Sequence, residues 1–169
     1  ASVNCGHAVS SAGDVNDDGI ADIIIAEKNV AYVIFGRSLA TQGSSPFGEF
    51  TIPTSALPAF AGFRILGAET SEWNGRTVGA AGDVNVDGID DVIIGGPWVD
   101  TPSGADTGIT FVVFGKASGI GDVQLHTGTT VMNAAIGFRI LGAEAGDLSG
   151  HTVSGAGDLN HDGASDIII

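Results

Sequence analysis

Basic residues and cysteine are scarce in this sequence of 169 residues. Lys and Arg together number 6 against 20 Asp and Glu, so the formal net charge is −14. Such an acidic chain is disfavoured as a binder of nucleic acid or of anionic membrane surfaces. Cys5 is the only cysteine, which excludes an intramolecular disulfide, and we interpret it as incidental.

Long apolar runs are also missing. No stretch of 18 consecutive apolar residues occurs, so we expect no helix that spans a membrane and no membrane insertion. No signal peptide is visible, and we therefore expect a mature or trimmed chain. With 27 Gly and 43% hydrophobic residues, the sequence is instead typical of one folded domain with a substantial core.

The sequence contains no recognisable catalytic constellation. It has no Gly-x-Ser-x-Gly elbow, and Cys5 has no His in a supporting context. His7 and His151 occupy equivalent places in a repeat, but Arg76 replaces them in the copy between, which argues against a shared metal or catalytic role. The sequence therefore predicts a protein that is not an enzyme, although a fold by itself does not exclude activity.

The most informative feature present is a nine-residue pattern, Asp-x-Asn-x-Asp-Gly-x-x-Asp, which occurs three times. We name the copies loop 1 (residues 14–22), loop 2 (83–91) and loop 3 (158–166). Side-chain oxygens stand at positions one, three, five and nine, and the glycine at position six permits a sharp turn that lets the backbone carbonyl of position seven join them. Oxygen ligands at this spacing suit Ca²⁺ better than Mg²⁺, which prefers a stricter octahedron. The predicted metal ligands are Asp14, Asn16, Asp18, Ile20 and Asp22 in loop 1, Asp83, Asn85, Asp87, Ile89 and Asp91 in loop 2, and Asp158, Asn160, Asp162, Ala164 and Asp166 in loop 3.

An ordinary Asp-Gly turn between two strands is the alternative for any single copy, because Asp, Asn and Gly favour turns. Three copies with the same oxygen-bearing positions favour cation binding. The loops differ from EF-hands, since Ile25, Ile94 and Ile169 stand where an EF-hand carries its Glu at position twelve. An apolar, β-branched run follows each loop, so each loop is predicted to join two strands. We therefore predict about three Ca²⁺ per chain.

Other segments recur in step with the three loops. Small residues fill the segment before each loop, which suits a crowded place where several strands converge. An aromatic segment and a segment that contains Phe-Arg follow in the first two copies. The recurring segments are 6–13, 75–82 and 150–157 before the loops, 31–36 and 110–115 for the aromatic segment, and 62–69 and 137–144 for the Phe-Arg segment.

Each complete unit is therefore predicted to contain four antiparallel strands, and repeats of this size are typical of β-propeller blades. The predicted fold is all-β and consists of ten strands. It is a partial propeller of about two and a half blades, and residues 1–169 form one segment. The expected units are blade 1 at about 6–67, blade 2 at about 75–142 and half-blade 3 at about 150–169.

These repeats resemble the FG-GAP repeats of integrin alpha-subunit β-propellers and of their bacterial relatives. Phe35-Gly36 and Phe114-Gly115 match the FG element, and Gly95-Gly96-Pro97 matches GAP with Gly for Ala. The first repeat has Ala26-Glu27-Lys28 in place of GAP, and the nine-residue pattern matches the family's calcium loop with Asn as its second ligand. The resemblance covers essentially the whole chain. It implies a propeller, usually of seven blades, that binds calcium in these loops and serves extracellular adhesion or protein recognition, either secreted or at the cell surface.

The order of strands in a meander decides which loops share a face. Loops after the first and third strands of each unit fall on one face, and loops after the second and fourth strands fall on the other. Trp73 and Trp98 are both predicted on the face away from calcium, where integrin-like propellers recognise ligands. The alternative is that each Trp packs against the edge of a neighbouring blade, as large aromatic side chains mostly do.

Three functions are open at this point. The first is a calcium-stabilised segment of an adhesion or recognition protein, with a protein ligand as partner. The second is a purely structural repeat of an extracellular array or fibre, and the third, less favoured, is a hydrolytic propeller. Because the last unit has only its first two strands, we also expect a fragment that associates with neighbouring propeller segments or with itself.

Overall fold

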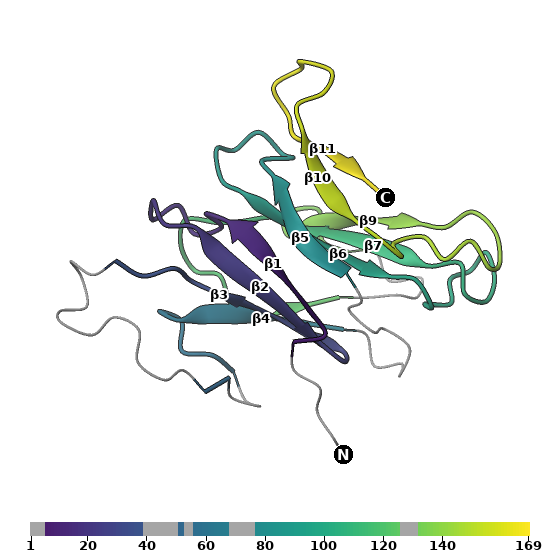
Figure 1. Ribbon diagram of the computed structural model, residues 1–169, viewed down its shortest axis with the longest axis horizontal. Coiled ribbons are helices and arrows are strands. Elements are labelled where there is room, and N and C mark those ends of the chain that lie inside the picture. Colours follow the sequence, from purple (N-terminus) through teal and green to yellow (C-terminus); the bar gives the residue numbers. More distant parts are fainter. Residues whose placement is uncertain (1–5, 39–50, 53–55, 68–76, 126–131) are drawn as a thin grey trace.

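The computed structural model describes residues 6–38, 51–52, 56–67, 77–125 and 132–169 (Figure 1). Within these ranges the chain forms strands, turns and loops and no helix, which confirms the all-β prediction. The strands are β1 (Ala8–Gly13), β2 (Asp22–Glu27), β3 (Val30–Ile34), β4 (Gly62–Leu66), β5 (Thr77–Gly82), β6 (Asp91–Gly96), β7 (Ile109–Val113), β8 (Val123–Gln124), β9 (Gly137–Leu141), β10 (Ser154–Gly157) and β11 (Asp166–Ile168).

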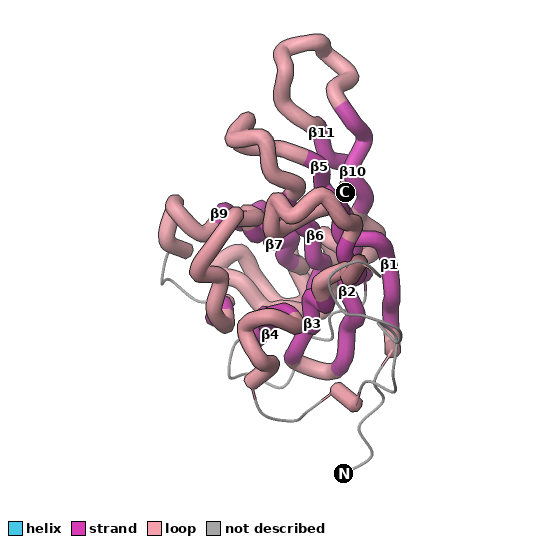
Figure 2. Tube along the Cα trace, turned by 90° about the vertical axis from the view of Figure 1, so that its left-hand side faces the viewer, coloured by secondary structure: helices cyan, strands magenta, loops and turns pink. Residues whose placement is uncertain are grey.

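The strands form three sheets that follow the repeat. The first sheet has the order β1-β2-β3-β4-β8, the second β5-β6-β7-β9, and the third contains β10 and β11. Neighbours within the repeat pair antiparallel, as blades of four antiparallel strands require. The three sheets form no closed ring within the described residues (Figures 1 and 2).

The first strands of the three units pack against one another. β5 contacts β1 on one side and β10 on the other, so that these strands gather where the sheets converge (Figure 1). Their small residues allow this approach: a side chain at Gly155 would meet the carbonyl oxygen of Ala80 at 2.8 Å. The small-residue segments before the loops therefore occupy the crowded place that their composition predicts.

A single apolar core joins the first two sheets. It contains Ile24 and Phe63 from the first sheet, together with Ile94 and Phe111 from the second. Every residue of β6 and β7 is buried, because both faces of the second sheet are covered at these two strands. That burial explains why the apolar run after loop 2 lacks the alternation of a strand with one wet face. A smaller cluster around Ile93 and Val112 joins the second sheet to the β10–β11 hairpin.

β8 is the strand that the sequence analysis missed, and it makes the count of described strands eleven where ten were predicted. It belongs to the connection between β7 and β9, yet it pairs in parallel with β4 of the first sheet. Asp122, just before β8, accepts hydrogen bonds from the backbone NH (3.0 Å) and from Nη2 (2.6 Å) of Arg64. Val123 and Leu125 enter the core. The second unit thus reaches across and covers the outer edge of the first.

Loops on the side opposite to loops 1–3 are joined to each other. The segment 97–108 after β6 and the segment 143–151 after β9 are connected by backbone hydrogen bonds, which include Leu148 N to Asp106 O at 3.1 Å and Ser149 N to Thr107 O at 3.0 Å. Loops after the second and fourth strands therefore share one face, as the meander predicts.

Candidate cation-binding loops

The three loops have the same backbone conformation. Position six is a glycine with a positive φ in each loop, at 82° in Gly19, 89° in Gly88 and 93° in Gly163. Position four also has a positive φ, at 57° in Asp17, 61° in Val86 and 62° in His161. Val86 is the unusual member of this group, because a β-branched side chain disfavours the left-handed region. The sequence pattern alone gives no sign of this conformation at position four.

The carboxylate at position one organises each loop. In loop 1, Oδ1 of Asp14 accepts a hydrogen bond from the NH of Asp18 at 3.0 Å, and Oδ2 accepts one from the NH of Gly19 at 2.7 Å. The same two bonds recur in the other loops, with the acceptors Asp83 and Asp158. The spacing that the three copies share is therefore a requirement of the backbone as well as of any bound ion.

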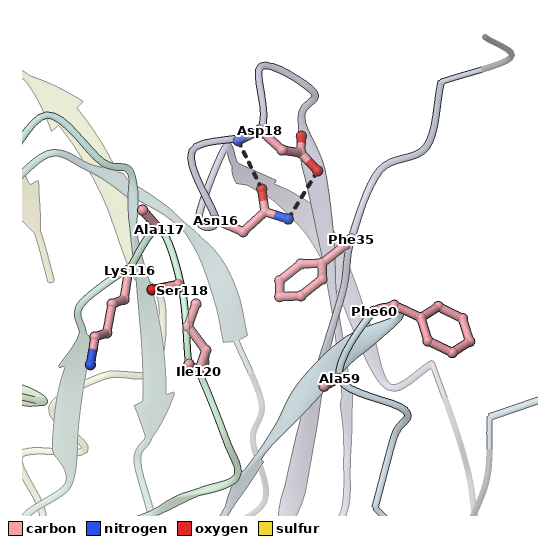
Figure 3. A pocket seen from close by; sticks show the side chains of 10 residues that line it. Asn16, Asp18, Phe35, Ala59, Phe60, Lys116, Ala117, Ser118 and Ile120 are labelled. Carbon is pink, nitrogen blue, oxygen red and sulfur yellow. Dashed lines mark hydrogen bonds between the residues drawn. The ribbon is translucent and has the colours of Figure 1, made fainter. Parts of the chain in front are cut away.

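Positions three and five continue this arrangement. Oδ1 of Asn16 accepts the NH of Asp18 at 3.2 Å, and Oδ1 of Asp18 accepts the NH of Ile20 at 2.9 Å. The Asn16 amide also donates to Oδ2 of Asp18 at 3.0 Å (Figure 3). Loop 2 repeats all three bonds. In loop 3 the amide of Asn160 is turned instead towards Oδ1 of Asp166, at 3.5 Å.

The aspartate at position nine is the first residue of the strand that follows each loop. Asp22 is 1% exposed and Asp91 is 0% exposed. Oδ2 of Asp22 accepts the NH of Val15 at 2.9 Å, and Oδ1 accepts the NH of Gly36 at 2.7 Å. Asp91 makes the same pair of bonds, whereas Asp166 of loop 3 is only partly buried and accepts the NH of Leu159 at 2.8 Å.

These bonds explain the Phe-Gly element. The glycine after the third strand donates its NH to the buried aspartate, and its α-carbon lies against the backbone of position eight. A side chain at Gly36 would collide with the carbonyl oxygen of Ala21, and one at Gly115 would collide with that of Asp90. The glycine is therefore required by close approach of two backbones.

Burial and like charges perturb the carboxylates at position nine. Burial raises the pKa of Asp91 to about 6, and the nearby charges of Asp87 and Asp83 push in the same direction, against two backbone hydrogen bonds that lower it. The pKa of Asp22 is also raised, first by burial and then by the charges of Asp18 and Asp14. The carboxylates of one loop thus repel each other, and a bound cation would relieve that repulsion.

The donors of each loop fit a hard cation. They are three carboxylates, one amide carbonyl and one backbone carbonyl, all of them oxygen, as Ca²⁺ prefers. Each carboxylate oxygen has two lone pairs, so a backbone NH bond leaves capacity for a metal. In the described ranges no three His, Cys, Asp or Glu side chains are drawn together closely enough to hold a metal ion as they stand. In loops 1 and 2 the reason is the orientation of the aspartate at position nine, because both oxygens of Asp22 and of Asp91 are turned to backbone NH groups.

A cavity of about 360 Å³ lies beside loop 1 (Figure 3). Asn16 and Asp18 lie at one end of it, and the side chains of Phe35 and Ile120 lie on its two sides. The remaining lining residues belong to segments 59–60 and 116–119, which follow the third strands of the first two units. Loops after the first and third strands therefore share a face, as predicted.

Of the two tryptophans on the predicted ligand face, the structure describes one. Trp73 lies outside the described residues. Trp98 lies on the face opposite to loops 1–3 and is partly buried, with its ring edge-on to that of His151 at a centroid distance of 6.3 Å. Its role in ligand binding stays a prediction.

No helix of the described residues is long and apolar enough to span a membrane.

Comparison with known proteins identifies related sequences. No family model matches the chain. The sequence is similar to integrin alpha pat-2 of Caenorhabditis elegans, with 30% identity over 164 residues, and to integrin alpha pat-2 of Caenorhabditis briggsae, with 28% identity over 176 residues. Each alignment covers 95% of this chain, which spans 12% of the length of each relative. The resemblance to integrin alpha-like FG-GAP repeats is thereby confirmed.

Proposed function

We propose that this protein, an integrin alpha-like FG-GAP repeat region, is a calcium-binding β-propeller segment of an extracellular adhesion or protein-recognition protein. Similarity to integrin alpha chains over nearly the whole sequence supports the adhesion class and a place outside the cell. It also supports a binding role over an enzymatic one. The partner in this proposal is a protein ligand or a neighbouring propeller segment.

The observation that carries calcium binding is the common geometry of the three loops. Each loop presents the same five oxygen donors on the same backbone, with positive φ at positions four and six. In loops 1 and 2, the carboxylates at positions one and five act electrostatically on the buried one at position nine. The same carboxylates accept backbone NH bonds of the turn, but their mutual repulsion at close range is what a cation at the centre of the loop would relieve.

In each loop the proposed ligands are the side chains of positions one, three, five and nine and the backbone carbonyl of position seven. A bound Ca²⁺ supplies two positive charges at the centre of the loop. The chain's own residues then hold the loop in register: position one caps the turn in each loop, and in loops 1 and 2 position nine ties it to the Phe-Gly element. Calcium binding on this view rigidifies the hairpins at which the sheets converge.

The decisive experiment is calorimetric titration of the chelator-treated chain with CaCl₂, with MgCl₂ in parallel. We expect close to three calcium sites and weaker binding of magnesium. Thermal melts should show a higher midpoint in calcium, because a ligand at a hundredfold excess over Kd stabilises by about 2.7 kcal/mol per site. No heat of binding at millimolar calcium, together with equal melting temperatures with and without chelator, would show that the loops are ordinary turns.

A structural repeat without a specific ligand is the second candidate, and the packing of Trp98 against His151 favours it. A Trp98→Ala variant separates the two functions in a binding assay with a candidate protein ligand. Loss of binding at unchanged melting temperature supports recognition on this face. Loss of stability with unchanged binding supports the structural candidate.

A further inference from the structure

Loop 1 is held from outside its own sheet by a residue of loop 2. Oδ2 of Asp90 accepts a hydrogen bond from the backbone NH of Asp14 at 2.9 Å. In return, the NH of Asp90 donates to the carbonyl oxygen of Asp14 at 3.3 Å. Asp14 is position one of loop 1, and Asp90 is position eight of loop 2, 76 residues later. The two bonds join consecutive repeats at a proposed calcium ligand.

The interface between the second and third repeats has a contact that corresponds to the one between Asp90 and Asp14. Position eight of loop 3 is Ser165, and its NH donates to the carbonyl oxygen of Asp83, position one of loop 2, at 2.8 Å. This bond is equivalent to the one from the NH of Asp90 to Asp14. Ser165 lacks a carboxylate, and among the described residues only loop 1 has a bond from the NH of position one to the side chain of position eight of the next loop.

The glycine before each loop makes room for this contact. Gly13 and Gly82 have φ of 76° and 73°, and a side chain on either would collide with the side chain of position eight of the following loop, Asp90 or Ser165. Around Gly157, which precedes loop 3, the described residues leave open space within 4 Å of an added side chain. Within the described chain, loops 1 and 2 are therefore closed by the next repeat and loop 3 is not.

A third bond, from a different residue, fixes loop 1 to the following repeat. The NH of Lys116, directly after the second Phe-Gly element, donates to the carbonyl oxygen of Val15 at 2.9 Å. Positions one and two of loop 1 are thus both held by the second repeat. None of these contacts involves the ligand oxygens, so they position the ligand without competing for the ion.

We propose that Asp90 is a positioning residue for the calcium site of the preceding loop. The inference rests on the proposed calcium-binding function and adds that the sites of loops 1 and 2 are completed by the next repeat along the chain. By holding the backbone of Asp14, Asp90 presets the direction of the first ligand carboxylate, and its own charge adds to the negative potential at loop 1. Calcium binding in one repeat is then coupled to the packing of that repeat against its successor.

The test is a site-resolved calcium titration of the full chain by amide NMR. The NH groups of Gly19, Gly88 and Gly163 each donate to the position-one carboxylate, so their resonances report loops 1, 2 and 3 separately. Asp90→Asn and Asp90→Ala both remove the charge, but only the alanine removes the acceptor. We expect Asp90→Ala to weaken loop 1 about tenfold, as for loss of a charge-assisted hydrogen bond, and Asp90→Asn to weaken it about threefold. Asp90 belongs to loop 2 without being one of its ligands, so loop 2 should weaken less than loop 1 in both variants.

Asp106→Asn is the matched control, because it removes one charge from the opposite face and should leave all three affinities within about twofold. Ser165→Asp is the reciprocal variant, which offers loop 2 the carboxylate that it lacks and should tighten its affinity severalfold. This second variant decides the question if Asp90→Ala does not fold. In wild type we also expect loop 3 to bind more weakly than loops 1 and 2.

The outcomes separate the two proposals. If none of the three glycine resonances of the wild-type chain responds to millimolar calcium, the proposed function itself fails. If the loops bind calcium but Asp90→Ala changes loop 1 by less than twofold, or weakens loop 2 as much as loop 1, Asp90 does not position the site of loop 1. An unchanged loop 2 in Ser165→Asp would overturn the inference in the same way.

Discussion

The backbone NH of Gly115 donates a hydrogen bond of 2.9 Å to Oδ1 of the buried Asp91, 24 residues earlier in the chain. The bond joins the end of β7 to the last residue of loop 2. Gly36 and Asp22 form the same bond at 2.7 Å in the first repeat. The Phe-Gly element and the Asp-rich loop are therefore two halves of one local structure, and a change in either should affect the other.

Gly115→Ala should destabilise the protein by about 2 kcal/mol or more, as overpacking of a tight contact does. The added methyl group would collide with the carbonyl oxygen of Asp90 and approach Cγ2 of Ile89 to 2.7 Å, and a backbone oxygen has little freedom to move. Urea denaturation in calcium measures the loss. Gly121→Ala is the control, since the described residues leave open space there. Equal stability of the two variants would contradict the close approach.

Asp87→Ala should remove one bound calcium and lower the melting temperature in calcium, because it deletes a ligand of loop 2. In chelator the change should be small: the lost hydrogen bond to the NH of Ile89 is offset by relief of the repulsion that Asp87 exerts on Asp91. Metal analysis after desalting and paired thermal melts measure both effects. Asp17→Asn, which changes a charge at a position that is not a ligand, should keep the full calcium content.

Val86→Asn should stabilise the protein by about 1 kcal/mol, because valine at a φ of 61° is strained and asparagine tolerates the left-handed region. Val86 is largely exposed, so little buried surface is lost. Chemical denaturation in chelator isolates the backbone effect from calcium binding. A destabilised variant would mean that the valine side chain makes a contribution larger than the strain.

Local patterns predicted the loops and the strand order, because they depend on residues close together in the sequence. The repeat spacing gave four strands per unit, and the small residues before each loop pointed to crowding. The pairing of β8 with β4 could not be predicted, since Val123 and Gln124 form two residues of a long connection whose partner is set by tertiary packing. In loop 2 the pattern assigned Asp91 and passed over its neighbour Asp90, whose contact lies 76 residues away.

The ion pair between Arg64 and Asp122 should give a small pH dependence of stability. The hydrogen bonds from Arg64 hold the pKa of the Asp122 carboxyl below its usual value. The ionised carboxylate therefore contributes its full stability above the unfolded pKa of about 3.9. That contribution is lost as the pH falls through the folded pKa. A double-mutant cycle with Arg64→Gln and Asp122→Asn should give a coupling of about 0.5–1 kcal/mol at pH 6. The coupling should fall towards zero once the pH is below the lowered folded pKa of Asp122, and it should shrink in high salt.

The aromatic pairs of the first two sheets have the same geometry and different exposure. Phe35 and Phe63 have ring centroids 6.1 Å apart, and so do Phe114 and Phe138. Phe63 is 2% exposed because it lies in the core between the first two sheets, whereas Phe138 is 37% exposed. The surface around Phe138 is therefore the equivalent of one that another sheet covers in the first repeat, and we expect a blade-like sheet of the same repeat to fit it.

We accordingly expect the isolated chain to associate in calcium through this surface, with a molar mass by light scattering that rises with concentration. Phe138→Thr should reduce the association, because it removes apolar surface that favours burial while keeping a good strand former at that position. Phe60→Thr is the control: Phe60 is 72% exposed, but it lies at the cavity beside loop 1, with Arg37 over its ring at 5.6 Å. A monomer that resists changes in concentration, or association lost in Phe60→Thr and kept in Phe138→Thr, would show that another surface mediates the contact.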